Sequence, residues 1–499
     1  MGIVIRQSFR MVVLAYLGAF LGFINTLWLY PLALTEEQIG LTRTLVNAAF
    51  LFATFAALGS GNMPGRFFPY FNNREKKHHG FLFFLLLIGT LGYSLFLAFF
   101  FLAKDWVYGT YIVAAPMLVS YLYFLLPFTA IVLFWTIFEA YSIIQQMPVV
   151  PNFLRETFIR GAFSIGLLLV LLKVIGFHTF IIMIVGAYGL ILVVLILYLQ
   201  NKGVLFLRPQ REIFTHTKTK EMLAFGSFLL MGNVSGAIIA NIDGLMLSAY
   251  SGLKSTGIYS IAFFIGTIVE IPKRSLSQVL VPLVSEANKN EDRPLLATLY
   301  KKSSINQLIV GGFIFIVIWC NIDNIFRLIP HGDVFVQGKW VVFFIGMARL
   351  FDMLTGINAE IIGTSKYYRY DLVFYVLLGL IGIGANMLLI PLLGMTGAAV
   401  AAAISIFLFN TMRYVFIYLK YHMQPFSLGT IKMLLAGVGI IFLSSLVSTK
   451  LSVVPDIILR SGMITVLFVA VVYGLQVSDD VMDMTKKIFL LMKQRIGRK

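Results

Sequence analysis

Charged residues, cysteine and histidine are scarce in this chain of 499 residues. Only 12% of the residues are charged, against about 25% in soluble globular proteins. The single cysteine, Cys320, excludes an internal disulfide framework and a cysteine-based metal cluster. The six histidines follow no metal-ligand spacing, and the sequence has neither a nucleophile elbow nor a phosphate-binding glycine loop with a lysine. These absences argue against an enzyme, and we expect no cofactor and no metal.

Apolar residues, in contrast, make up 59% of the chain, and the mean hydropathy is +0.90. A membrane-spanning helix needs about 20 mainly apolar residues, and fourteen segments qualify. These are approximately residues 10–31, 40–60, 80–102, 112–136, 153–175, 178–200, 222–250, 256–283, 300–321, 335–363, 371–391, 394–420, 430–448 and 457–477. We therefore expect an all-α polytopic membrane protein with 14 transmembrane helices.

The Lys and Arg residues that give the net charge of +17 are spread unequally over the two sides of the predicted helices. If the N-terminus is inside, 30 Lys and Arg residues fall on the inner side of the predicted helices and 8 on the outer side. Basic residues concentrate in the cytoplasmic loops of membrane proteins, so we expect both termini in the cytoplasm. No motif interleaves the basic residues with aromatics, and we expect no nucleic-acid partner.

Two halves of the chain repeat a pattern. Asn25 precedes Gly40 by 15 residues and Asn241 precedes Gly257 by 16, and each pair joins the end of one predicted helix to the start of the next. The polar linker 201–221 separates six predicted helices from the next six, and an even number leaves both halves in the same orientation. The predicted parts are two pseudo-symmetric six-helix bundles (1–200 and 222–422), helices 13 and 14 (423–478) and a basic cytoplasmic tail (479–499).

Polar side chains interrupt the predicted membrane helices of residues 222–286. They are Asn233, Asn241, Asp243, Glu270, Lys273 and Arg274. A charged side chain at the centre of a bilayer costs from about 3 to well over 10 kcal/mol. Such groups are therefore expected to face a protein interior or a wet cavity.

Four short stretches follow one another in a fixed order at the ends of predicted helices. They are Asn241-Ile242-Asp243, Gly257-Ile258-Tyr259-Ser260, residues 281–286 (VPLVSE) and residues 391–399 (PLLGMTGAA). Together with the six-plus-six arrangement, they resemble the polysaccharide transporters, which are the oligosaccharide flippases of the multidrug/oligosaccharidyl-lipid/polysaccharide (MOP) exporter superfamily. The resemblance implies two bundles around a V-shaped central cavity and transport by alternating access.

The resemblance also implies a substrate and a location. The substrate would be an undecaprenyl-pyrophosphate-linked oligosaccharide, an O-antigen (lipopolysaccharide) or exopolysaccharide repeat unit, moved from the inner to the outer leaflet of the bacterial cytoplasmic (inner) membrane. The implied partners are this polyprenyl-pyrophosphate-linked glycan, membrane lipids, a glycan polymerase and glycosyltransferases. We expect a monomer, coupled to a proton gradient, a sodium gradient or the membrane potential.

Three alternatives are compared with this function. Flippases of the lipid-linked peptidoglycan precursor carry arginines within helices 1 and 2, where this chain has Ile24 or Asn25 and no basic residue in the middle of helix 2. Cation-coupled multidrug exporters resemble a twelve-helix version, so helices 13 and 14 favour a flippase. Membrane glycan polymerases carry a large outer loop, and the longest one expected here, about 321–337, is under 20 residues.

Basic residues in or beside the predicted helices are candidates for binding pyrophosphate, because arginine bonds two phosphate oxygens through its planar fork. Arg349 lies in the middle of a helix, three residues before Asp352. We interpret it as a cavity-lining cation balanced by Asp352, or else as one member of a structural ion pair. The further candidates are Arg43, Arg10, Lys273 and Arg274. Anchoring at the membrane interface is the alternative for these four.

Carboxylates in the predicted membrane helices are candidates for ion coupling. They are Asp243, Glu270, Asp352, Glu360 and Glu139. A carboxylate in a low-dielectric site can load and release a proton as a cavity alternates, and pairing with a nearby base is the alternative. Asn25 and Asn241 are candidates for contacts with sugars, although hydrogen bonding between helices is the commoner role of such residues.

Overall fold

The computed structural model describes residues 14, 16–210, 212–215, 217–447 and 451–477, which form helices and no strand. Eleven of the helical segments are long and apolar enough to cross a membrane. The chain is therefore an all-α, multi-pass membrane protein, as its composition predicts. Large apolar side chains stay exposed along these helices, such as Leu102 and Leu392 (87% and 77% exposed), which suits contact with lipid.

The predicted number of fourteen membrane helices is not confirmed. Two of the eleven spans each hold two predicted segments, because α12 (Thr217–Thr267) and α19 (Tyr368–Tyr421) continue through a glycine with non-helical backbone. These glycines are Gly252 (φ 80°) and Gly394 (φ 57°), and a positive φ of this kind favours glycine. The gap between the predicted segments 222–250 and 256–283 is thus reduced to a break at Gly252. The predicted segment 153–175 is not among the eleven spans, and three charges, Arg155, Glu156 and Arg160, fall in its first half.

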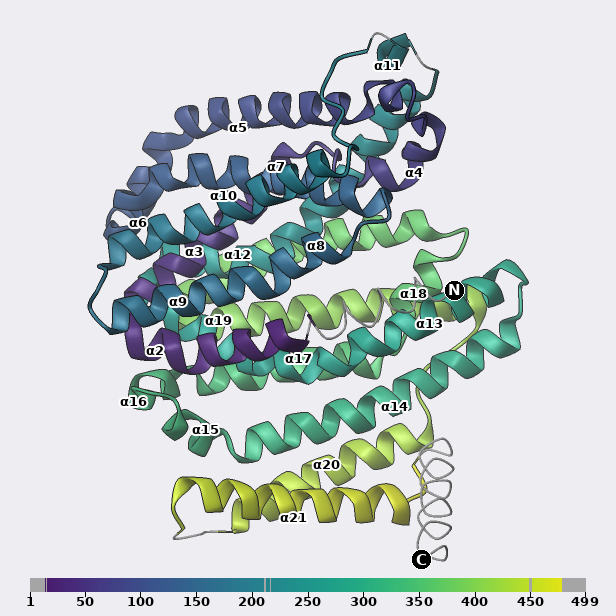
Figure 1. Ribbon diagram of the computed structural model, residues 1–499. Helices are drawn as coiled ribbons and strands as arrows, with labels where there is room; N and C mark the ends of the chain where they lie inside the picture. Colours follow the sequence, from purple (N-terminus) through teal and green to yellow (C-terminus); the bar gives the residue numbers. More distant parts are fainter. Residues whose placement is uncertain (1–13, 15, 211, 216, 448–450, 478–499) are drawn as a thin grey trace, which may run out of the picture. The chain divides into compact units, whose positions relative to one another are not determined.

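Contacts group the chain into two units, residues 1–260 and 261–499. The helices of the first unit are η1 (Asn25–Leu29), α2 (Tyr30–Ala33), α3 (Glu36–Ala56), α4 (Met63–Phe71), η2 (Lys77–Gly80), α5 (Phe81–Tyr111), α6 (Pro116–Tyr121), η3 (Leu122–Phe124), α7 (Leu125–Ile144), α8 (Val149–Asn152), η4 (Phe153–Phe158), α9 (Ile159–Leu171), α10 (Phe177–Asn201), α11 (Glu212–Thr215) and the larger part of α12. Helix α7 packs against α3, α5 and α10, and α5, α7 and α10 lie side by side in Figure 1.

Local sequence explains where α3 begins. Thr35 accepts a hydrogen bond from the Gln38 backbone N–H (3.3 Å), and the Gln38 side chain accepts one from the Thr35 backbone N–H (3.1 Å). This reciprocal capping box satisfies two backbone donors that the helix cannot pair internally. Glu36 and Glu37 add negative charge to the first turn, which stabilises the positive end of the helix dipole.

The part of α12 up to residue 260 belongs with the first unit. Its Gly226 carbonyl lies against Gly59, its Leu245 carbonyl accepts a hydrogen bond from the Tyr111 hydroxyl (3.1 Å), and its Gly257 lies against α3. The compact units therefore divide at 260/261, inside α12. The predicted repeat boundary at 201–221 rests on sequence equivalence and stays a prediction.

The second unit begins within α12. Its other helices are η5 (Ile268–Glu270), α13 (Ile271–Lys289), α14 (Arg293–Cys320), α15 (Ile322–Leu328), α16 (Gly332–Phe335), η6 (Val336–Gly338), α17 (Lys339–Leu354), α18 (Asn358–Gly363), α19, α20 (Leu428–Leu446) and α21 (Val453–Gly474). Helix α14 packs against α13 and α17 and also against α20 and α21, which lie together beside it in Figure 1. Helices α20 and α21 correspond to the predicted helices 13 and 14.

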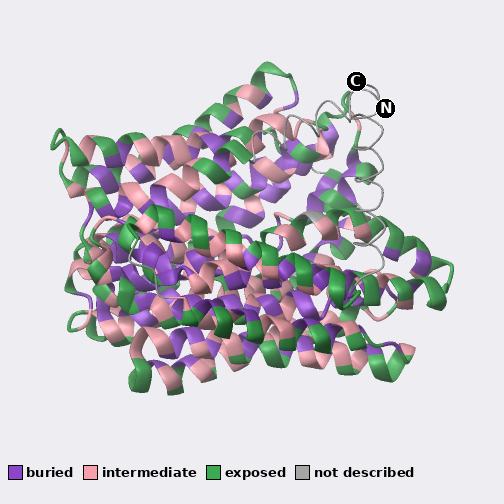
Figure 2. Cartoon of the chain, turned by 90° about the horizontal axis from the view of Figure 1, so that it is seen from below, coloured by how far each residue is buried: buried purple, intermediate pink, exposed green. Residues whose placement is uncertain are grey.

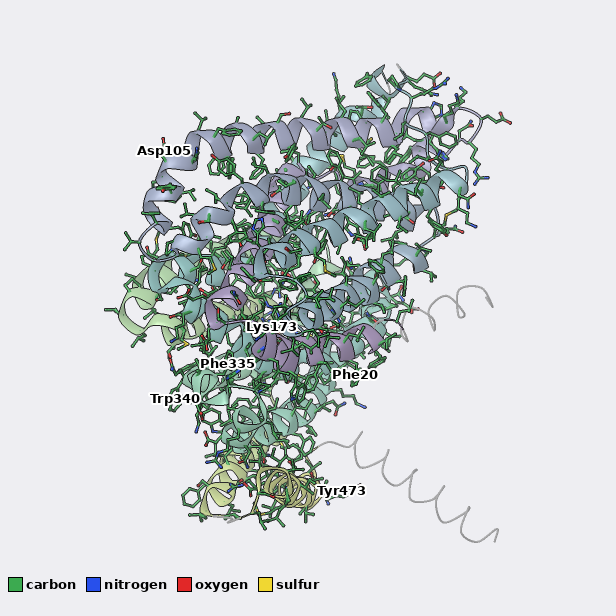
Figure 3. The ribbon with its side chains drawn as sticks, turned by 60° about the vertical axis from the view of Figure 1, so that its left-hand side comes forward. Phe20, Asp105, Lys173, Phe335, Trp340 and Tyr473 are labelled. Carbon is green, nitrogen blue, oxygen red and sulfur yellow. The ribbon has the colours of Figure 1, made fainter. Side chains whose placement is uncertain are left out.

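Buried and exposed residues alternate along most helices, as Figure 2 shows. Aromatic residues gather at the start of α17, where Trp340 (52% exposed; Figure 3) contacts the rings of Trp319 and Phe343. Lys339 lies 5.7 Å from the Trp319 ring centroid. A group of tryptophans and a lysine at a helix end is typical of the interface between lipid and water.

Candidate functional site

A polar pocket of about 380 Å³ lies in the first unit, between α3, α7 and the first part of α12. Its polar lining residues are Thr54, Asn62, Thr136, Asn233 and Asn241. None of its lining residues, all of which lie in the described part of the chain, carries a charge. The volume falls in the range of small-molecule sites, about 300–1,000 Å³. Uncharged amides and hydroxyls at membrane depth suit a ligand that is itself neutral and rich in hydrogen-bonding groups.

Two predicted polar residues of 222–286 therefore face the same pocket. Asn241 donates a hydrogen bond to the Ala237 carbonyl of its own helix (2.8 Å), one turn away. Asn233, two turns earlier on the same helix, is exposed in the pocket lining. The eight-residue spacing puts both amides on one face of α12.

Asn25 has a different environment. It is 4% exposed, its amide donates to the Arg160 carbonyl (2.8 Å), and its carbonyl oxygen accepts from the Ser164 hydroxyl (2.6 Å). These bonds join η1 to α9 and correspond to the interhelical role that polar residues commonly have in membranes. The two asparagines that the repeat pattern equates are therefore placed differently, since Asn241 lines the pocket and Asn25 does not appear in its lining.

Arg43 and Glu139 are held by partners within the first unit. Arg43 donates to the Thr26 hydroxyl (3.1 Å) and lies over the Tyr30 ring at 5.2 Å from its centroid. Glu139 forms an ion pair with Arg155 (2.8 Å). Asp243 accepts a hydrogen bond from the Tyr259 hydroxyl (3.4 Å), which joins the two halves of α12 across the break at Gly252. Arg10 lies outside the described residues.

The charged site of the second unit is a pair of adjacent ion pairs. Arg349 Nη1 lies 2.7 Å from Glu270 Oε2, and Lys273 Nζ lies 2.6 Å from Asp352 Oδ2. Each pair joins residues 79 positions apart. The segment from Glu270 to Lys273 therefore runs in the same direction as α17, with the two pairs stacked one helical turn apart.

The expected pairing of Arg349 with Asp352 is wrong. Both residues lie on α17, and each pairs instead with a residue near the start of α13. Glu270 also pairs with Arg274 at 2.8 Å, so this carboxylate is shared between two arginines. Arg274 is largely exposed (76%), whereas Arg349 (24%) and Glu270 (13%) are mostly covered. Five sequence-predicted candidates are thus brought together, of which three are bases and two are acids.

Glu360 is separate from this site. It lies on α18, and among the described residues no group hydrogen-bonds to its buried Oε2. Asp371 lies close enough to Glu360 for the two charges to interact. Asp371 accepts a hydrogen bond from Arg413 Nε (2.8 Å). Arg413 is 3% exposed, and its guanidinium carbon lies 4.0 Å from the centroid of the Phe409 ring. Arg413 is not among the candidates that the sequence predicted. The signal that would have found this pair is the place of Arg413 about two turns before the end of α19, an unusual depth for an anchoring residue.

The helical arrangement is similar to that of solved membrane proteins. The fold is similar to that of a lipid II flippase, MurJ, in an inward closed conformation (13% identity, TM-score 0.71, covering 95% of this chain and 100% of that one). It is also similar to an inward-facing multidrug resistance transporter of the MATE family in the MOP superfamily (13% identity, TM-score 0.61, covering 81% of this chain and 94% of that one). None of the curated proteins matches the sequence significantly.

Residues 4–288, more than half of the chain, match the model of a family described as polysaccharide biosynthesis protein. The chain belongs to this family, and its structural neighbours are transporters of the MOP superfamily. The family resemblance that the four sequence stretches indicated is confirmed.

Proposed function

We propose that this protein is a flippase that moves an undecaprenyl-pyrophosphate-linked oligosaccharide from the inner to the outer leaflet of the bacterial cytoplasmic membrane by alternating access. The observation that carries the proposal is the uncharged polar pocket within the membrane helices of the first unit. A glycan presents many hydroxyls and no positive charge, and it is matched by the amides of Asn62, Asn233 and Asn241. A hydrophobic cationic drug would instead favour an apolar or acidic lining.

Two further observations support a flippase over a multidrug exporter. The family is one of polysaccharide biosynthesis. The similarity to the lipid II flippase extends over 95% of the chain, against 81% for the multidrug transporter. A lipid-linked peptidoglycan precursor is the alternative substrate that this fold favours.

In this proposal Arg349 receives the pyrophosphate. Its guanidinium is partly covered and is held by Glu270, which keeps a second partner in Arg274. An arriving pyrophosphate replaces Glu270 at Arg349, and Glu270 stays paired with Arg274, so no buried charge is left alone. Lys273 and Arg43 are secondary phosphate contacts, and Arg10 is a candidate at the start of the chain.

Coupling to a proton, to sodium or to the membrane potential is part of the proposal. Among the candidates Asp243, Glu139, Glu270, Asp352 and Glu360, the last has a buried oxygen with no hydrogen-bond partner among the described residues. A buried carboxylate oxygen without a hydrogen-bond partner suits a site that binds a cation. We place the protein in the inner membrane as a monomer with both termini cytoplasmic, acting between glycosyltransferases and a glycan polymerase.

Transport by the full-length protein in liposomes tests this function. A fluorescent undecaprenyl-pyrophosphate-linked oligosaccharide should become accessible in the opposite leaflet, measured by quenching with an impermeant reagent. The double variant N233A/N241A should slow this transport roughly thirtyfold, since each lost hydrogen bond is worth about 1 kcal/mol and tenfold corresponds to about 1.4 kcal/mol. The matched control is Asn201→Ala, at the exposed end of α10, which should transport normally.

Three results would contradict the proposal. Efflux of a cationic dye without turnover of the lipid-linked oligosaccharide would make the protein a multidrug exporter. Equal transport by N233A/N241A and the unchanged protein would remove the pocket from the transport path. Faster turnover of a lipid-linked peptidoglycan precursor than of the oligosaccharide would favour the alternative substrate.

A further inference from the structure

A second cavity, of about 330 Å³, lies in the second unit where several helix ends meet. It is formed by the turn between α13 and α14, the turn between α18 and α19, and the last residues of α19. Four of its lining residues are basic: Lys289, Arg293, Lys366 and Lys420. One, Glu291, is acidic. The cavity therefore has a formal charge of about +3 in a small volume.

The four basic side chains of this basic pocket are not neutralised by the protein. Within the described part of the chain, none of them forms an ion pair with a carboxylate. The nearby Asp292 is engaged as a helix cap, since it accepts a hydrogen bond from the Leu295 N–H (3.0 Å). Like charges that converge on one cavity repel one another unless an anion lies between them.

Two of the lysines lie against the same aromatic ring at the pocket. Lys366 Nζ and Lys420 Nζ lie 5.5 and 5.9 Å from the centroid of the same ring, that of Tyr367. This ring in turn contacts those of Phe416 and Tyr421. Cation–π contacts of this kind orient ammonium groups without cancelling their charge.

The floor of the basic pocket is rigid. Asn288 donates hydrogen bonds to the Thr364 hydroxyl (2.7 Å) and to the Ile361 carbonyl (3.0 Å), which fixes α13 to α18. Beneath it, Leu296 and Tyr300 of α14 pack with Ile361 in a buried apolar cluster. All four basic residues are exposed, so an anion can reach the hollow that they surround.

We propose that the basic pocket binds a phosphate group, carried either by the headgroup of an anionic phospholipid or by a soluble phosphate. The arginine fork and three lysines supply the charge-assisted hydrogen bonds that phosphate oxygens accept. Basic pockets between membrane helices are suited to anionic lipid headgroups. The site is independent of the proposed transport function, since it shares no residue with the polar pocket or with the ion pairs of Arg349.

Thermal unfolding of the full-length protein in nanodiscs tests the proposal. Phosphatidylglycerol added to phosphatidylcholine nanodiscs should raise the Tm. In a second arm, inorganic phosphate added to phosphatidylcholine nanodiscs distinguishes the soluble source from the lipid source. The variant K366Q/K420Q should lose most of the rise, with apparent affinity weakened roughly tenfold or more, because each lysine near an anionic headgroup contributes about a fivefold change.

The charge-matched control is K202Q/K220Q, which removes two exposed lysines of the first unit. It should keep the stabilisation by phosphatidylglycerol or phosphate. If K366Q/K420Q does not yield folded protein, K289Q/R293Q takes its place in the same comparison. An equal loss in the control and the pocket variant, or no effect of either phosphate source on the Tm, would overturn the proposal.

Discussion

Gly40 of α3 and Gly257 of α12 lie against each other in the first unit. A Cβ atom on Gly40 would come within 2.0 Å of the Leu253 carbonyl oxygen and 3.1 Å of the Gly257 nitrogen. A Cβ on Gly257 would come within 2.0 Å of the Glu36 carbonyl oxygen and 3.2 Å of the Gly40 nitrogen. Each glycine thus touches the carbonyl one turn before the other, which is the reciprocal pattern that a local two-fold axis produces.

This crossing predicts that neither glycine tolerates a side chain. We expect Gly40→Ala and Gly257→Ala each to lower the free energy of unfolding by about 1–3 kcal/mol or more, because the added methyl group meets backbone that cannot move aside. The control is Gly186→Ala on α10, where a Cβ would meet nothing within 4 Å. Unfolding of each variant in detergent, followed by circular dichroism, measures these free energies. Equal free energies of unfolding in all three variants would contradict the prediction, because α3 and α12 would then move apart without loss of stability.

The shared carboxylate of Glu270 predicts unequal roles for its two arginines. Arg349→Gln should reduce transport of the lipid-linked oligosaccharide at least tenfold, about 1.4 kcal/mol in transition-state stabilisation. Glu270 would keep Arg274, so we expect the variant to remain folded. Arg274→Gln, which removes the exposed partner (76% exposed), is the comparison and should lower transport less than Arg349→Gln does, because Arg349 remains to receive the pyrophosphate. A similar loss in both variants would mean that the network is only structural.

The ion pair of Lys273 and Asp352 predicts strong coupling in a double-mutant cycle. Their side chains are 15% and 19% exposed, so removing one partner leaves a poorly solvated charge. We expect Asp352→Leu alone to cost about 3 kcal/mol of unfolding free energy, and K273M/D352L to recover most of it. The exposed pair of Lys339 and Asp323 (32% and 61% exposed) is the comparison, and Lys339→Met should cost about 1 kcal/mol or less. Additive effects at Lys273 and Asp352 would argue against the pair.

The distribution of basic residues predicts sidedness that single cysteines can report. In a background that carries Cys320→Ser, Lys202→Cys at the end of α10 should react with an impermeant maleimide only from the cytoplasm. Lys104→Cys, next to Asp105 near the end of α5 (Figure 3), should react only from outside. The expected difference follows from the inner excess of Lys and Arg. Labelling of both cysteines from the same side would refute the predicted topology. Labelling in permeabilised cells is the control, since it shows that each cysteine can react with the maleimide.

Several parts of the fold and site were predictable because they depend on composition along the chain. The membrane helices follow from apolar length, and the break before α13 follows from Pro272, which stands in the first turn of that helix. The pocket residues Asn233 and Asn241 stood out because amides inside apolar helices need partners or water. The equivalence of Gly40 and Gly257 was visible in sequence spacing, although their contact was not.

The partners of the charged residues were not predictable in the same way. Asp352 lies one turn from Arg349, yet Arg349 pairs with Glu270, 79 positions away. The choice depends on how far α17 is rotated and shifted along its axis relative to the start of α13, and hydropathy carries no information on either. The same reason hid the buried pair of Asp371 and Arg413.

The amino-acid sequence by itself determined that this protein lies in a membrane, because a chain that is 59% apolar with long uncharged runs cannot expose them to water. It also determined the family, through short stretches at helix ends. Only the tertiary structure decided which glycines cross, which amides share a pocket and which acid holds Arg349. Those contacts join helices that are distant in sequence, and their register is set by side-chain packing rather than by the order of residues along the chain.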